Sequence, residues 1–442
     1  MQGPLVNDAR HIFRAALAAA DAGEAVRRTL ALSEGDRLKV GESILSLSGY
    51  DRIYAVGAGK AVVPMAAALE DILGERLTAG AVVTKYGHAG PLSRIEVMEA
   101  DHPIPDTQGL SGVRKILKLI TPANERDLVF CLFSGGASAL MPHPAEGLTL
   151  HEKQTATTLL LKSGARIHEV NTVRKHLSMV KGGRLLKAAH PAKTVTIMIS
   201  DVIGDDPSVI ASGPTSPDSS TFGEAIEILS RYGLSSRVPR AVSNWLERGA
   251  RGEIPETPKP GDPIFDSAIN IVAASLGLSL NAAEKMARSK GYNTLVLTSR
   301  LCGEAREAAR ALSAVALEAA LNGRPVKRPA CIISGGETTV TVAGGGLGGR
   351  NQELALSAAL ELDGDPEILL LSIGTDGSDG PTRAAGALAD NTTVKRARAA
   401  GLSPEAFLKA NDSHRFFEAL GDTVTTGPTR TNVMDMQVFL IP

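Results

Sequence analysis

The chain has 442 residues, more than one hydrophobic core usually organises, so we expect two domains or three. Hydrophobic residues make up 43% of the sequence, which is enough for well-formed cores, and 47 basic residues almost balance 48 acidic ones. This balance leaves no excess positive charge for a phosphate backbone or an anionic membrane, and aromatic residues at 3% offer little stacking surface. We therefore expect neither a nucleic-acid partner nor a membrane partner.

The N-terminal segment and the cysteines indicate the compartment. Residues 7–23 have the charge spacing of an amphipathic helix, unlike the uninterrupted apolar stretch of a signal peptide. No segment approaches the roughly 18 apolar residues that a membrane span needs. The cysteines are far apart in the sequence and are interpreted as buried small apolar residues in a reducing compartment: Cys131, Cys302 and Cys331. A soluble, cytoplasmic protein is expected.

The chain is organised as short β-branched runs that alternate with longer helical patterns, which predicts βαβ units and a largely parallel sheet. Residues 251–266 contain four prolines and few apolar residues, and are typical of a linker. After this segment the alternation resumes with more glycine-rich loops. We predict an α/β fold with two domains, the first at residues 1–250 and the second at residues 267–442.

The sequence VGAGKA at residues 56–61 follows an early apolar run and places Lys60 after a glycine turn. It is not a P-loop, because the glycine spacing differs and Ala61 replaces the hydroxyl residue that binds magnesium. It also departs from the dinucleotide fingerprint, since Val62 replaces the third glycine and no acidic residue ends the next strand. Lys85 ends that strand instead, which is compatible with a dinucleotide that carries a 2′-phosphate. Two interpretations remain: an anion site beside exposed amides, or a surface lysine after a structural turn.

Two similar turns follow later apolar runs. Residues 133–140, FSGGASAL, and residues 333–338, ISGGET, each end a predicted strand with small residues that let a carboxylate or phosphate approach the backbone. Each alone is commonly a simple turn, but two of them favour ligand binding, and the second adds Glu337. Between them, Arg174 and Lys181 share one stripe of a predicted helix, for which a solvated basic edge is the default explanation.

Carboxylates and a glycine-rich segment follow further apolar runs. Asp201 comes directly after one run, and Asp376 and Asp379 come after another. Magnesium commonly uses one or two such carboxylates, whereas Asp-Gly pairs also simply make turns. Residues 344–349 hold five glycines before Arg350. A loop with so many glycines loses much conformational entropy when it is ordered, which favours a backbone that wraps a ligand. An arginine at the start of a helix is well placed to bind a phosphate. The alternative interpretation of this segment is a flexible hairpin.

Taken together, these motifs resemble those of the bacterial class II glycerate 2-kinases, whose C-terminal half carries the MOFRL domain. The resemblance covers almost the whole chain, through the ordered segments VGAGKA, FSGGASAL, RKHLSMVKGGRL, SDVIGDDPSVIASGPTSPD, SGGET, GGRNQELAL, GTDGSDGPT and TGPTRTNVMD. It implies a Rossmann-like N-terminal domain, a MOFRL-type region at about residues 330–440 and an active site in the cleft between the two domains.

The resemblance also implies a reaction. The γ-phosphoryl group of ATP is transferred to the 2-hydroxyl group of D-glycerate, giving 2-phosphoglycerate, with a divalent cation such as Mg²⁺. In the family this reaction is thought to depend on a lysine and an arginine that match Lys60 and Arg350. Two positions depart from many relatives, because Arg383 and Arg430 occupy slots that are variable there. If either slot touches the substrate, the acceptor preference differs.

Phosphoryl transfer needs positioning and charge neutralisation, and the expected residues follow from that need. Lys60 and Arg350 are assigned to the developing phosphoryl charge, and Asp201 or Asp376 to metal binding or to proton transfer. The expected glycerate-binding residues are Ser134, Gly135, Gly136, Ala137, Arg174 and Lys181. The expected nucleotide-binding residues are Gly57, Gly59, Gly345, Gly346, Gly348, Gly349, Asn351 and Glu337. The expected metal ligands are Asp201, Asp376 and Asp379. A monomer or a homodimer is expected.

Two other functions stay open at this point. One is an NAD(P)H-dependent hydroxypyruvate reductase, a name often attached to this family; the broken fingerprint at Gly57 and the missing ribose-binding acid count against it. The other is a non-catalytic nucleotide-binding sensor, which would bind ATP without turnover.

Overall fold

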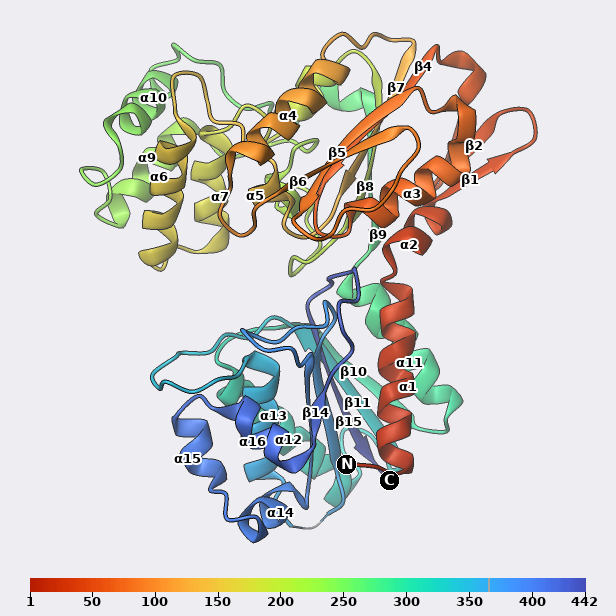
Figure 1. Ribbon diagram of the computed structural model, residues 1–442, viewed down its shortest axis with the longest axis vertical. Helices are drawn as coiled ribbons and strands as arrows, with labels where there is room; N and C mark the ends of the chain where they lie inside the picture. The colour runs from red at the N-terminus through yellow and green to blue at the C-terminus, as the bar shows by residue number, and fades with distance from the viewer. Residues whose placement is uncertain (365) are drawn as a thin grey trace. The chain divides into compact units, whose positions relative to one another are not determined.

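The computed structural model describes residues 1–364 and 366–442 (Figure 1). Its contacts divide the chain into two compact units. Residues 22–273 form one, which we call the central unit; residues 1–21 together with residues 274–442 form the other, which we call the terminal unit. Each unit contains a six-stranded sheet with helices, so the predicted α/β class with two domains is confirmed.

The central unit is built on a sheet with the strand order β6-β5-β4-β7-β8-β9. The strands are β4 (Arg52–Ala58), β5 (Ala79–Lys85), β6 (Ile95–Ala100), β7 (Asp127–Phe133), β8 (Lys193–Ile199) and β9 (Ala268–Ala274). The first five pair in parallel, as the alternating sequence pattern predicted. β4, β7 and β8 are almost entirely buried, because a parallel sheet is covered on both faces and its strands are continuous apolar runs.

Two groups of helices belong to this unit. Around the sheet lie α2 (Ala22–Thr29), α3 (Val62–Leu73), α4 (Thr107–Ile120), α5 (Ala137–Leu140) and α8 (Arg184–Ala189). A helical group follows, with α6 (Leu150–Lys162), α7 (Ile167–His176), α9 (Phe222–Arg231) and α10 (Arg240–Ala250), and it has an apolar core of its own around Phe222 and Trp245. A small antiparallel sheet contains β1 (Leu30–Ser33), β2 (Arg37–Val40) and β3 (Ser43–Ser46).

The terminal unit contains a mixed sheet with the order β10-β11-β15-β12-β13-β14. Its strands are β10 (Asn293–Leu301), β11 (Ala330–Gly336), β12 (Leu369–Gly374), β13 (Gly386–Asp390), β14 (Thr423–Val424) and β15 (Asp435–Ile441). Within the described part of this sheet, only the β10–β11 pair is parallel. The helices are α1 (Pro4–Ala19), α11 (Leu276–Ser289), α12 (Ala305–Asn322), α13 (Arg350–Glu361), α14 (Thr393–Ala399), α15 (Pro404–Lys409) and α16 (Ser413–Leu420).

The N-terminal helix α1 is part of the terminal unit, not of a domain at residues 1–250 as the sequence suggested. Figure 1 shows it alongside α11. Asp8 of α1 accepts hydrogen bonds from Lys290 Nζ at 2.8 Å and Tyr292 Oη at 2.9 Å, and Thr431 Oγ1 donates to the Ala20 carbonyl oxygen at 2.6 Å. The amphipathic pattern of α1 predicts that one face is covered, but it does not say which segment covers it.

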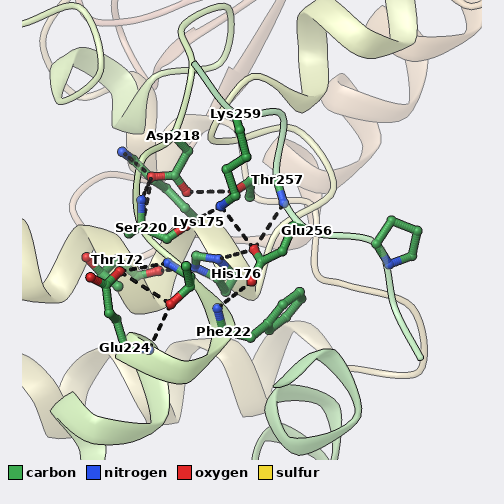
Figure 2. Close-up of polar contacts among 12 residues, drawn as sticks. Thr172, Lys175, His176, Asp218, Ser220, Phe222, Glu224, Glu256, Thr257 and Lys259 are labelled. Carbon is green, nitrogen blue, oxygen red and sulfur yellow. Dashed lines mark hydrogen bonds and ion pairs between the residues drawn. The ribbon is translucent and has the colours of Figure 1, made fainter. Parts of the chain in front are cut away.

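The expected linker is also packed into a unit. Glu256 accepts a hydrogen bond from His176 Nε2 at 3.0 Å, and Thr257 Oγ1 donates to Asp218 at 3.0 Å (Figure 2). Lys259 Nζ lies 3.1 Å from Glu256. These contacts tie residues 256–259 to the central unit, and β9 then adds an edge strand to its sheet. The compact units therefore do not follow the boundaries that proline content suggested.

Two further expectations concern membrane segments and thiols. No helix among the described residues is long and apolar enough to cross a bilayer. The three cysteines are free, and Cys131 and Cys331 are buried as expected. Cys302 is exposed, which corrects the expectation for that residue, since it follows the last residue of β10 instead of lying within the strand.

The contact between Glu256 and His176 generates a prediction. His176 is fully buried, and burial alone would raise the pKa of Glu256, but bonds from His176 and the Phe222 N–H lower it to about 2. Because the folded-state pKa is lowered, this stabilisation is present above the unfolded-state pKa near 4.5 and is lost as the pH falls toward 2. We expect Glu256→Ala to lower the free energy of unfolding at pH 7 by about 1–3 kcal/mol, because His176 Nε2 loses its partner.

Urea unfolding of the full chain measures this change. The control is Glu253→Ala, which removes an exposed partner of Arg248 and Arg251 and should leave the midpoint nearly unchanged. Equal shifts in the two variants would contradict a structural role for the buried contact.

Candidate functional site

Lys60 follows the turn between β4 and α3, and this turn is shaped by the neighbouring strand β7. A Cβ atom at Gly57 would lie 2.0 Å from the Leu132 carbonyl oxygen, and one at Gly59, where φ is +143°, would lie 2.1 Å from Ser134 Oγ. The amides that follow are used as well, because the Lys60 N–H donates to the Gly135 carbonyl oxygen at 2.8 Å. Close packing of strands therefore explains both glycines, and their expected role in nucleotide binding stays a prediction.

The side chain of Lys60 is half-buried beside the 134–137 loop. A Cβ at Gly136, where φ is +87°, would lie 3.3 Å from Lys60 Cγ and 3.1 Å from His102 Cδ2, so the three residues are adjacent. Burial, followed by the positive charges of Lys60 and Lys85, lowers the pKa of His102 to about 4. His102 is therefore neutral near pH 7, and Lys60 is the cation at this position.

A cavity of about 370 Å³ lies next to this loop within the central unit. It brings together six of the residues that the sequence singled out: Ser134, Gly136, Ala137, Arg174, Lys181 and Asp201. Its walls also include residues of α6 and α7 and an apolar segment that begins at Pro103. The sequence therefore singled out six residues of this cavity wall without predicting the helices that enclose it, and the expected roles of these residues stay predictions.

The basic residues of the cavity are more deeply buried than a solvated basic edge would be. Lys181 is only 1% exposed, and its Nζ donates to the Ser138 carbonyl oxygen at 2.8 Å, so the default explanation is wrong for this residue. Burial, followed by the charges of Lys153 and Arg174, lowers the pKa of Lys181 well below its usual value. Lys153, on α6, is a wall residue that sequence reasoning missed, because an isolated lysine in an amphipathic pattern carries no signal of burial.

In the terminal unit, Arg350 is the first residue of α13 and is held by two carboxylates. Its Nε and Nη2 donate to Asp435 at 2.5 and 3.0 Å, and its Nη1 lies 2.9 Å from Glu337. Burial alone would lower the pKa of Arg350, but the bonds to Asp435 raise it. Burial raises the pKa of Asp435 to about 6, which the pairing with Arg350 opposes. Asp435 is the first residue of β15 and ends the segment TGPTRTNVMD, but nothing in the sequence assigned it a role.

Asp379 caps the helix that carries Arg350. It accepts hydrogen bonds from the backbone N–H groups of Asn351 and Gln352, each at 2.9 Å, and from Gln352 Nε2 at 2.9 Å. Both carboxylate oxygens are thus used inside the protein. The anion at the N-terminus of α13 is therefore the Asp379 side chain. The side-chain oxygen of Asn351 in turn accepts a hydrogen bond from Ser372 Oγ at 2.9 Å.

The other expected metal ligands differ from Asp379. Asp376 is half-buried, and its Oδ1 accepts hydrogen bonds from the Ser378 N–H and Oγ, while no described residue donates to its Oδ2. Asp201 lines the cavity of the central unit. Among residues 1–364 and 366–442, no three His, Cys, Asp or Glu side chains are grouped as a metal site. The expected roles of Asp201 and Asp376 as metal ligands stay predictions.

The glycine-rich segment 344–349 wraps part of its own chain. Cβ atoms at Gly344 and Gly348 would lie 2.1 Å from the Ala410 carbonyl oxygen and 2.3 Å from Ser413 Oγ. The N–H groups of residues 344, 346 and 347 donate to residues 411, 410 and 412, at 2.9, 3.0 and 2.8 Å. Only Gly345 in this segment has open space around its Cβ position. Contact with residues 410–413 thus explains most of these glycines.

Comparison with known proteins gives two family models and several relatives. One model, described as a domain of unknown function (DUF4147), matches residues 8–247, and the MOFRL family model matches residues 330–435. D-glycerate 2-kinase of Thermotoga maritima is 45% identical over 88% of this chain and 91% of its own length. A protein of Agrobacterium vitis with the provisional name hydroxypyruvate reductase is 44% identical over 98% of this chain and 93% of its own length.

A solved structure is similar over the full length. The crystal structure of glycerate kinase from Thermotoga maritima is 42% identical in sequence, has a TM-score of 0.88, and the match covers 99% of each chain.

The cap at α13 generates a prediction. We expect Asp379→Ala to lower the free energy of unfolding by about 1–3 kcal/mol, because several buried donors lose their acceptor. Circular dichroism during urea unfolding measures the change. Asp363→Ala, which removes an exposed partner of Arg398, is the control and should have little effect. A stability of Asp379→Ala equal to that of the wild type would contradict the capping role.

Proposed function

We propose, because the chain belongs to the glycerate kinase family that carries the DUF4147 and MOFRL regions, that this protein is a glycerate 2-kinase. It transfers the γ-phosphoryl group of ATP to the 2-hydroxyl group of D-glycerate and releases 2-phosphoglycerate and ADP. Within the structure, the observation that carries the proposal is the cavity beside Lys60. Three of its basic side chains, Lys153, Arg174 and Lys181, form no ion pair with a described residue, as a site for anionic substrates requires.

The reaction requires charge neutralisation more than covalent chemistry. The oxygen of the 2-hydroxyl group attacks the γ-phosphorus, and the bond from that phosphorus to the β–γ bridging oxygen breaks. The proton of the hydroxyl group passes to a carboxylate, for which Asp201 in the cavity wall is the candidate. The ammonium group of Lys60 stabilises the charge that develops on the phosphoryl oxygens.

In the terminal unit, Arg350 is the corresponding cation. Asp435 and Glu337 fix its guanidinium group from two sides, so that little reorganisation is needed when a phosphoryl group meets it. Asp376 is the residue of this unit that would hold Mg²⁺. Mg²⁺ neutralises charge on the β- and γ-phosphates when it is bound.

The proposal includes a cytoplasmic location and action as a monomer or a homodimer. The free cysteines are compatible with a reducing compartment.

A hydroxypyruvate reductase is the second candidate, because a relative carries that name provisionally. A dinucleotide needs free backbone N–H groups at the first glycine turn for its pyrophosphate. Here the N–H groups of Lys60 and Ala61 are bonded to the Gly135 carbonyl oxygen and to Ser134 Oγ, at 2.8 and 3.0 Å. This occupancy favours the kinase.

Two assays on the purified protein separate these functions. The first follows ADP release from ATP, Mg²⁺ and D-glycerate, with enolase added to detect 2-phosphoglycerate. The second follows NADH or NADPH absorbance with hydroxypyruvate. Nicotinamide oxidation without ADP release would overturn the kinase, and ATP binding without turnover would indicate a sensor.

Lys60 provides the sharpest mutational prediction. We expect Lys60→Met to lower kcat by roughly 100- to 1,000-fold, because a cation that acts mainly in the transition state is lost. Lys118→Met, on the exposed face of α4, is the control and should keep wild-type activity. Circular dichroism checks that both variants fold. A wild-type rate in Lys60→Met would indicate that the turn before Lys60 has only a structural role.

Lys60 and Arg350 lie in different units, and a double-mutant cycle tests whether they serve one chemical step. We expect Arg350→Met to lower kcat by a similar factor, and the double variant to lose less than the product of the two single losses. Steady-state rates of ADP release measure the four proteins. Fully multiplicative losses would indicate that the two residues act independently.

A further inference from the structure

The cavity of the central unit contains a cluster of basic side chains that the proposed reaction does not yet assign to a particular substrate. The cluster consists of Lys153 on α6, Arg174 on α7 and Lys181, which follows α7. Lys153 is 6% exposed and Lys181 is 1% exposed. Within the described part of the chain, none of the three forms an ion pair, and the pKa values of Lys153 and Lys181 are lowered by burial and by neighbouring positive charges.

Lys153 is the least satisfied member of this cluster. Its Nζ atom is buried and has no hydrogen-bond partner among the described residues. An ammonium group has three donors, and burying them without a partner costs several kcal/mol. Lys181 uses one donor on the Ser138 carbonyl oxygen, and no carboxylate of residues 1–364 or 366–442 pairs with it. Buried cations without counter-charges are retained where a ligand supplies the charge.

Lys175 provides a comparison within the same segment. It follows Arg174 directly and is 7% exposed, almost as deeply buried as Lys153. Its Nζ donates to Asp218 at 3.2 Å, and Asp218 also accepts bonds from Thr257 and Ser220 (Figure 2). The protein thus neutralises a structural buried lysine with its own carboxylate. Lys153 has no such partner among the described residues, which separates it from a structural lysine.

The size of the cavity and its walls indicate the class of ligand. Its volume of about 370 Å³ exceeds what a three-carbon acid fills and is in the range of drug-sized ligands. Apolar side chains of Ile104, Leu161 and Ile167 line it and are more than half exposed, so they offer an open apolar surface for a flat ring. The cluster carries more positive charge than one carboxylate can match. A polyanion with an apolar ring satisfies both features.

We propose that this cavity binds the nucleotide, with Lys153, Arg174 and Lys181 holding its phosphate groups and the apolar wall holding its base. The inference rests on the proposed kinase function, and it assigns to the nucleotide two residues, Arg174 and Lys181, that the sequence assigned to glycerate. In this arrangement Lys60 lies beside the same cavity, next to His102 and Gly136, where it meets the phosphoryl group that is transferred.

Calorimetric titration of the full-length protein with ADP tests the inference. We expect Lys153→Met to weaken ADP binding by at least about tenfold, since a charge-assisted hydrogen bond is lost, while the KM for D-glycerate changes by less than about twofold. Lys162→Met, at the exposed end of α6, is the matched control and should bind ADP like the wild type. A weaker affinity for D-glycerate or 2-phosphoglycerate with unchanged ADP binding would overturn the inference.

Stability provides a second readout that a structural lysine would not give. We expect Lys153→Met to raise the urea midpoint or leave it unchanged, because an unpaired buried ammonium is replaced by an apolar chain of similar length. Lys175→Met should lower the midpoint, because Asp218 loses its ion pair. A loss of stability in Lys153→Met comparable to that in Lys175→Met would contradict a ligand-binding role.

Proton uptake on binding adds a pH test. The charged and titratable groups of the cavity besides Lys153 are His102, Arg174, Lys181 and Asp201, and Arg184 and His143 lie nearby. The pKa of Lys153 is lowered to about 7, so at pH 8 a bound polyanion should draw a proton onto it, and ADP affinity should fall as the pH rises through 7. Titrations in buffers of different ionisation enthalpy measure this uptake, which should decrease in Lys153→Met; an unchanged uptake would count against Lys153.

These outcomes separate the two proposals. A wild-type protein that binds ADP through Lys153 but does not phosphorylate glycerate would refute the kinase and leave the nucleotide site standing. A wild-type protein that phosphorylates glycerate and whose ADP affinity does not depend on Lys153 would refute the nucleotide site and leave the kinase standing.

Discussion

The close approach of β4 and β7 is the constraint on which the site in the central unit depends. Side-chain atoms at Gly57 and Gly59 would collide with the backbone of β7 and with Ser134, so only glycine allows the two strands to end side by side. Their loops therefore meet, and the Lys60 N–H of one loop donates to the Gly135 carbonyl oxygen of the other. The loops that follow parallel strands lie together at the carboxyl end of the sheet. The pairing of β4 with β7 therefore determines where both Lys60 and the cavity of the central unit lie.

The protein treats its buried charges in two distinct ways. Lys175 and Arg350 are each paired with a buried carboxylate, Asp218 or Asp435, which fixes the side chain and offsets part of the cost of burial. Lys153 and Lys181 are buried without such a carboxylate among the described residues. A fold that can place carboxylates beside lysines elsewhere has the means to neutralise this pair. Because no described carboxylate neutralises Lys153 and Lys181, the protein is less stable but keeps a surface that can bind an anion. Functional sites commonly trade stability for binding in this way.

Much of the fold and part of the site could be predicted from the sequence, for identifiable reasons. Continuous apolar runs such as 127–133 predict buried parallel strands, because burial on both faces leaves no polar alternation. Lys60 could be found because a glycine turn precedes it. Lys153 could not, since burial of a lysine depends on helices that arrive from elsewhere in the chain. The partner of α1, and the packing of residues 251–266, likewise depend on long-range contacts that local composition does not encode.

The glycine-rich segment before Arg350 shows that a sequence motif can be noticed for one reason and explained by another. The sequence suggested that these glycines wrap a ligand, whereas the structure shows them packed against the chain itself. Glycine lets a backbone approach any neighbour, whether that neighbour is a phosphate or another part of the chain. Here the neighbour of most of these glycines is the segment 410–413, and the N-terminus of α13 is already capped by Asp379. The glycines therefore anchor the start of the helix whose first side chain, Arg350, is oriented by Asp435. Asp435 thus holds the guanidinium group of Arg350, so the cation that the proposed reaction takes from the terminal unit is fixed before any substrate binds.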